Sequence, residues 1–133
     1  MKKILSVVTV VMLAMCMLAG CGKTYASVEE YFSEGDRIQQ ALDEGVKQME
    51  EAGVADLYSD YDFTVEGNTM IYSYVFADYY EIDTAAISEG LDDAFENIVK
   101  SVREGTGVKD TITVEWVYYD PDGEEMYRYS NQG

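Results

Sequence analysis

The chain has 133 residues, with 9 basic and 26 acidic side chains and no histidine, so its formal net charge is −17. This length favours a single domain. The acidic excess argues against nucleic-acid binding, which needs Lys and Arg to displace phosphate counterions. The absence of histidine excludes catalytic triads and metal sites that are built on that residue.

The chain begins with the layout of a signal peptide. Lys2 and Lys3 form a short basic start, and residues 4–18 are almost entirely apolar. This apolar run is short for a bilayer-spanning helix, and no basic flank follows it. We therefore interpret it as the apolar core of a secretory leader.

The end of that segment, Leu18-Ala19-Gly20-Cys21, resembles a bacterial lipobox. The resemblance implies that residues 1–20 are removed and that Cys21 becomes a diacylglyceryl-modified N-terminus on the outer face of the cell membrane. Residues 21–26 then form a short linker, and the mature chain keeps 7 basic and 26 acidic side chains, a charge of −19. An ordinary signal peptide, or a single membrane anchor with an incidental cysteine, is the alternative.

Helical patterning opens the predicted domain, which covers residues 27–133. Ser27 and Glu30 have the spacing of a capping box. Gly35-Asp36 is expected to interrupt or kink the helix that they begin, and a second stretch over residues 37–52 has apolar residues at helical spacing.

Alternating apolar residues next predict a β-hairpin over residues 62–76. Gly67-Asn68 between the two strands suits a two-residue turn, because Gly accepts positive φ without a steric penalty. This turn would pair Val65 with Met70 and place the apolar residues of both strands on one face.

A long amphipathic helix follows the hairpin. Asp83 or Thr84 is expected to cap it, and Gly105 and Gly107 to end it. Seven apolar positions repeat with the helical period. They are Ile87, Leu91, Ala94, Phe95, Ile98, Val99 and Val102.

A second hairpin ends the chain, with strands predicted over residues 111–119 and 124–129. Its turn, residues 120–123, has the sequence Asp-Pro-Asp-Gly, which is typical of a type I turn with Gly in a left-handed bulge position. One face of its first strand is apolar and is predicted to be core. That face consists of Ile112, Val114, Trp116 and Tyr118.

The order of elements is helix, hairpin, helix, hairpin. Since a hairpin cannot bury an apolar face alone, we expect an α+β fold. The predicted arrangement is a four-stranded antiparallel sheet with two helices packed on one of its faces.

Several segments of the mature chain have a common layout. They are Val28-Glu29-Glu30-Tyr31, Gly67 to Tyr74, the amphipathic helix, Gly107-Val108-Lys109-Asp110, and Val117 to Gly123. In these segments the chain resembles the small bacterial lipoproteins grouped as domain of unknown function 4854. The resemblance supports the location and the fold, and it implies no activity and no catalytic residue.

The sheet face away from the helices is the first candidate binding site. Tyrosine is amphipathic and loses little entropy on ordering, so it suits recognition of a protein, peptide or glycan partner, or of a second copy of the sheet. The alternative is that tyrosine simply favours strands. The predicted members of this face are Val117, Tyr119, Tyr127 and Tyr129, joined by Ile71, Ser73 and Val75.

Acidic residues at one hairpin end are the second candidate. Asp120, Asp122, Glu124 and Glu125 supply oxygen ligands of the kind that Ca²⁺ prefers. Their spacing lacks the EF-hand pattern, and turn chemistry explains Asp-Pro-Asp-Gly. We therefore expect a solvated loop, with no metal and no other cofactor.

Together these features predict a non-catalytic binding or interaction module that Cys21 anchors to the membrane. The sequence has no Gly-rich phosphate loop and no nucleophile elbow. The cysteine of the mature chain serves as the anchor, so we do not expect an enzyme. The alternative is a cation- or small-solute-binding lipoprotein that is accessory to a transporter.

Overall fold

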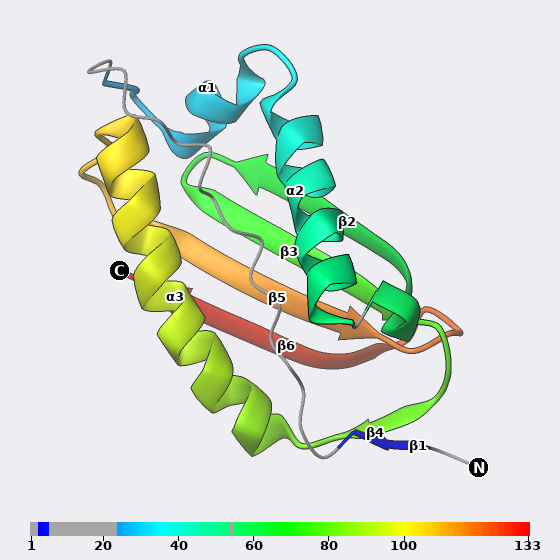
Figure 1. Cartoon of the computed structure of the whole chain (residues 1–133). Coiled ribbons are helices and arrows are strands. Elements are labelled where there is room, and N and C mark those ends of the chain that lie inside the picture. Colours follow the sequence, from blue (N-terminus) through cyan, green and yellow to red (C-terminus); the bar gives the residue numbers. More distant parts are fainter. Residues whose placement is uncertain (1–2, 6–23, 54) are drawn as a thin grey trace.

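The computed structural model describes residues 3–5, 24–53 and 55–133, and it shows a β-sheet with helices on one side (Figure 1). The predicted lipidation site, Cys21, and most of the predicted leader lie outside the described residues. In chain order the elements are β1 (Lys3–Leu5), α1 (Val28–Ser33), α2 (Arg37–Ala52), a 3-10 turn (Ala55–Leu57), β2 (Tyr58–Glu66), β3 (Thr69–Phe76), β4 (Tyr80–Ile82), α3 (Thr84–Thr106), β5 (Thr113–Tyr119) and β6 (Glu125–Gln132).

The helices begin where the sequence provides caps. The side-chain oxygen of Ser27 accepts a hydrogen bond from the amide of Glu30 at 3.1 Å, which confirms the predicted start of α1. Asp83 accepts from the amide of Ala86 at 3.1 Å and caps α3 in the same way. Gly35 has a φ of 57° and separates α1 from α2, so the described residues contain three α-helices where two were predicted.

The main sheet has the strand order β2-β3-β5-β6. Both hairpins form, and Val65 pairs with Met70 as predicted. The central strands β3 and β5 are parallel, so the prediction of a purely antiparallel sheet is wrong. The physical reason is α3: it carries the chain back to the end of the sheet where β3 began, so β5 must run in the same direction as β3 (Figure 1).

A second, two-stranded sheet pairs β1 with β4 in parallel. Because β1 belongs to the predicted leader, removal of residues 1–20 would separate β4 from this partner.

The helices cover one face of the main sheet and enclose the core (Figure 1). α2 packs over the edge strand β2, and α3 packs over the opposite edge strand β6. Six of the seven apolar positions predicted on α3 are buried, and Val99 is half-buried. The largest fully buried side chains are Trp116, Tyr72, Tyr118, Phe63, Phe76, Met70, Ile87, Leu91, Ile112, Val28, Val102 and Val114.

The last strand corrects the predicted assignment of faces. Tyr129 pairs with Trp116 and Tyr127 pairs with Tyr118, and residues directly opposite in an antiparallel pair point to the same face. Tyr127 and Tyr129 therefore lie on the helix-covered face, and the prediction that they share the open face with Val117 is wrong. The register near the turn contains a bulge, and a shift of one residue exchanges the two faces of a strand.

Candidate binding surfaces

The open face of the main sheet is the side on which none of the described helices lies (Figure 1). Val117 and Tyr119 are on this face as predicted, and the register places Val75 of β3 beside Tyr119. Ile71, Val75 and Tyr119 are half-buried, whereas Val117 is only 1% exposed. The open face therefore has a small apolar centre, with one tyrosine where the sequence predicted three.

A network of ion pairs borders this centre on the β6 side. The guanidinium of Arg128 lies 3.0 Å from Glu115 Oε1 and 2.9 Å from Glu125 Oε1. These hydrogen bonds, led by that to Glu125, raise the pKa of Arg128 above its usual value. Arg128 also pairs directly with Val117 across the strands. Since Arg128 is well exposed, we expect the network to orient side chains more than to stabilise the fold.

Tyr129 joins the edge of the sheet to α3. Its hydroxyl donates a hydrogen bond to Asp92 and accepts one from the side-chain amide of Asn131 at 3.1 Å. Its ring packs edge-on against Trp116, with centroids 5.6 Å apart. Burial, and then the bond to Asp92, raise the pKa of Tyr129 to about 12. The position and these bonds give Tyr129 a structural role in the packing of α3.

The central strands carry a stack of aromatic rings on the helix-covered face. Tyr72 stacks on Trp116 with centroids 5.3 Å apart, and Tyr74 stacks on Tyr118 at 5.4 Å. Both pairs follow from the parallel register, which places these residues side by side. Burial raises the pKa of Tyr72, Tyr74 and Tyr118 well above the usual value, so these hydroxyls stay neutral.

Three polar atoms of this stack are buried without a hydrogen-bond partner. They are the hydroxyls of Tyr72 and Tyr74 and the indole nitrogen of Trp116. An unsatisfied buried polar group destabilises a protein by about 1–3 kcal/mol, so such groups usually have an explanation. All three can donate a hydrogen bond. The alternation of apolar residues predicts only ordinary core positions for these side chains. The available signal was tyrosine at positions where phenylalanine would bury as much apolar surface.

The acidic hairpin end is organised by its own turn. The side chain of Asp120 accepts hydrogen bonds from the amides of Asp122 and Glu124 at 2.8 and 3.0 Å. Asp122 accepts from the hydroxyl of Tyr79 at 2.7 Å. Within the part of the chain that the structure describes, no group of three or more Cys, Asp or Glu side chains is arranged to hold a metal ion.

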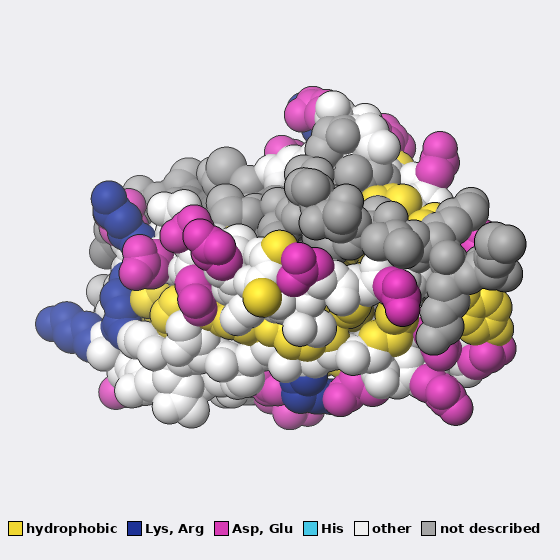
Figure 2. All heavy atoms as spheres, turned by 90° about the horizontal axis from the view of Figure 1, so that it is seen from below, with side chains coloured by type: hydrophobic (Ala, Val, Ile, Leu, Met, Phe, Trp, Pro, Cys, Tyr) yellow, Lys and Arg dark blue, Asp and Glu magenta, His cyan; other side chains and the backbone are white. Residues whose placement is uncertain are grey.

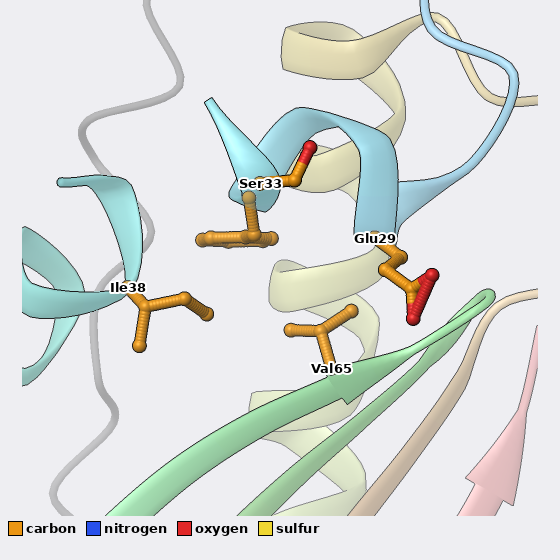
Figure 3. A pocket seen from close by; sticks show the side chains of 5 residues that line it. Glu29, Ser33, Ile38 and Val65 are labelled. Atoms are coloured by element: carbon orange, nitrogen blue, oxygen red, sulfur yellow. The ribbon is translucent and has the colours of Figure 1, made fainter. Parts of the chain in front are cut away.

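A small hollow lies between α1, the start of α2 and β2 (Figure 3). Its volume is about 140 Å³, below the usual range for small-molecule sites. Ile38 and Val65 point toward each other across it. Its polar side chains are engaged locally: Ser33 donates to the carbonyl of Glu30 at 2.7 Å, and Glu29 accepts from the amide of Gly67 at 3.4 Å.

These features define the class of the protein as an α+β domain with a mixed sheet that is covered by helices on one side. The chain belongs to the family described as Domain of unknown function (DUF4854), which it matches over residues 28–130. This match confirms the family resemblance of its strands and turns. No curated protein and no solved structure matches it. None of the helices in the described ranges is long and apolar enough to span a bilayer.

Proposed function

We propose that this protein is a non-catalytic binding module, held at the outer face of the cell membrane by a lipid on Cys21, with the open face of its main sheet as the interaction surface. The proposal of an anchor is supported by the sequence alone, through the basic start, the apolar run and the motif Leu18-Ala19-Gly20-Cys21. The proposal of a binding role is supported by the anatomy of the open face.

One observation supports the binding role. The open face, which no described element covers, has an apolar centre and a charged border. Ile71, Val75 and Tyr119 form the centre together with Val117. Protein interfaces combine such a centre with a polar rim. On the β2 side the rim consists of Asp60 and Asp62, which are exposed, and on the β6 side of the Arg128 network.

The charge of the rim indicates the kind of partner. Asp60 and Asp62 offer uncompensated negative charge, because the described residues place no cation within ion-pair distance of either. Arg128 is already bonded to Glu115 and Glu125. A second copy of this face would bring like charges together, so the rim favours a different protein with a basic border.

Site-specific photo-crosslinking tests this surface. A photoreactive amino acid at Tyr119 in the full-length protein should give a defined protein adduct in the producing bacterium. The matched control carries the same group at Gln40, an exposed position of α2. Charge reversal at Asp60 and Asp62 should weaken the Tyr119 adduct. Equal adducts from both positions, or none from Tyr119, would contradict the proposal.

Binding of a small solute, with the protein as an accessory to a transporter, is the second candidate. It is favoured by the three buried donors of Tyr72, Tyr74 and Trp116, which would suit a neutral ligand with acceptor oxygens. Native mass spectrometry of the protein purified from its own membrane should then show a bound small molecule. The Tyr72→Phe, Tyr74→Phe double variant should lose this bound molecule. If the wild-type protein carried no small molecule, binding of a solute would be excluded.

A further inference from the structure

The mature chain enters the domain at the C-terminal end of α3. The amide of Tyr25 donates to the carbonyl of Thr106 at 2.8 Å, and Tyr25 is 6% exposed. Thr24 packs closely against Gly107, where an added β carbon would lie 3.0 Å from the Thr24 methyl. Thr24 follows Cys21 by three residues, which span at most about 11 Å. A lipid on Cys21 would therefore hold this end of the domain beside the bilayer.

Basic side chains concentrate at the same end. Residues 97–110 contain three basic and two acidic side chains, whereas residues 24–96 contain two basic and nineteen acidic. Figure 2 shows several dark blue side chains at its left edge, with magenta carboxylates beside them and over much of the remaining visible surface. Lys100 and Lys109 are exposed, and neither has an ion-pair partner among the described residues.

Arg103 makes this end rigid. Its guanidinium donates to the carbonyl oxygens of Val108, Asp110 and Gly133 at 3.1, 3.2 and 2.6 Å. These bonds join the last turn of α3, the loop that contains Lys109, and the C-terminus. Arg103 is therefore committed to the fold, and among the described residues of this end Lys100 and Lys109 are the cations that form no ion pair.

The opposite end of the sheet is acidic. β5 starts beside the loop that contains Lys109 and rises over seven residues, about 23 Å, to the turn at residues 120–124. That turn carries Asp120, Asp122 and Glu124. This separation exceeds the Debye length of about 8 Å at physiological ionic strength, so these carboxylates do not cancel the local field of the lysines.

We propose that the C-terminal end of α3, through Lys100 and Lys109, docks the anchored domain on anionic lipid headgroups. This inference rests on the proposed anchor at Cys21, since the tether keeps the lysines close to the membrane. In the docked orientation the strands point away from the bilayer and the acidic turn is farthest from it. The open face of the sheet then stands clear of the lipid and accessible to a partner.

Lysine footprinting on vesicles tests the docking. The lipidated protein is placed on vesicles of phosphatidylcholine alone or mixed with phosphatidylglycerol, and flotation first establishes the anchor. Acetylation of each lysine is then followed by mass spectrometry. Lys100 and Lys109 should react roughly fivefold more slowly on the anionic vesicles. Lys47, exposed on α2, is the matched control and should react equally on both.

Two further measurements separate docking from anchoring. Lys100→Glu should reduce the protection of Lys109, Lys47→Glu should leave it unchanged, and 1 M salt should remove it because the Debye length falls to about 3 Å. Flotation without protection of Lys100 and Lys109 would overturn the docking and leave the anchor intact. A protein that does not float would overturn the anchor and the docking together.

Discussion

Replacing Tyr74 by phenylalanine removes one oxygen from the centre of the core. Tyr74 is 3% exposed, and its hydroxyl has no hydrogen-bond partner. Its ring is held by Tyr118 and Tyr58, with centroid distances of 5.4 and 5.1 Å. Phenylalanine keeps both ring contacts, so the substitution changes little except the unsatisfied polar group.

The expected effect is a gain in stability. Leaving a buried polar group unsatisfied costs about 1–3 kcal/mol, and its removal recovers that penalty. A small void in place of the oxygen offsets part of the gain. We therefore expect Tyr74→Phe to raise the free energy of unfolding by about 1 kcal/mol, which for a domain of this size corresponds to a rise of roughly 4 °C in Tm.

Urea unfolding followed by circular dichroism, with a parallel thermal melt, measures this change. Tyr129→Phe is the matched control, because the same chemical change there deletes bonds to Asp92 and Asn131. It should lower the free energy of unfolding by about 1–2 kcal/mol. If Tyr74→Phe destabilised the protein as much as Tyr129→Phe, the Tyr74 hydroxyl would have a bonding partner in solution and the reasoning would be refuted.

Three further outcomes are expected. Gly107→Ala should destabilise the domain by more than Gly53→Ala: both glycines have positive φ, 71° and 74°, but only at Gly107 does an added carbon meet Thr24. Equal losses of Tm would show that the contact with Thr24 is unimportant. Ser27→Ala should lower the free energy of unfolding in urea by about 1 kcal/mol, because α1 loses its cap. Ser27→Asp keeps a hydrogen-bond acceptor and should retain most of the stability of the wild-type protein. Burial and Asp92 raise the pKa of Tyr129 to about 12 in the folded protein, whereas the unfolded side chain titrates near 10. The contribution of Tyr129 to the free energy of unfolding is therefore complete below pH 10 and is lost as the pH rises toward 12. Tyr129→Phe should make the free energy of unfolding less dependent on pH between pH 10 and 12. If that dependence were unchanged, the raised pKa would not belong to Tyr129.

Local features of the fold were predictable because they depend on residues close together in the chain. The cap at Ser27, the pairing of Val65 with Met70 and the buried face of α3 follow from spacing alone. The match to the family over residues 28–130 agrees with the resemblance of those local segments.

The sheet and its faces were decided by tertiary structure. Each hairpin was visible in the sequence, but the direction of β5 relative to β3 depends on where α3 returns the chain. The face of Tyr127 and Tyr129 depends on the register after the final turn, which a shift of one residue reverses. The open face was therefore predicted to carry three tyrosines, whereas in the structure Tyr119 is the one of these three that lies on it.

By itself the sequence determined the charge, the helix caps and the two hairpins, because each depends on composition or on short-range spacing. The anchor at Cys21 is a prediction from the same kind of local pattern. Only the tertiary structure could bring Tyr72 beside Trp116, or place Lys100 and Lys109 at the end where the mature chain enters. Those juxtapositions join residues that are distant in the chain, and no local pattern specifies which distant residues will meet.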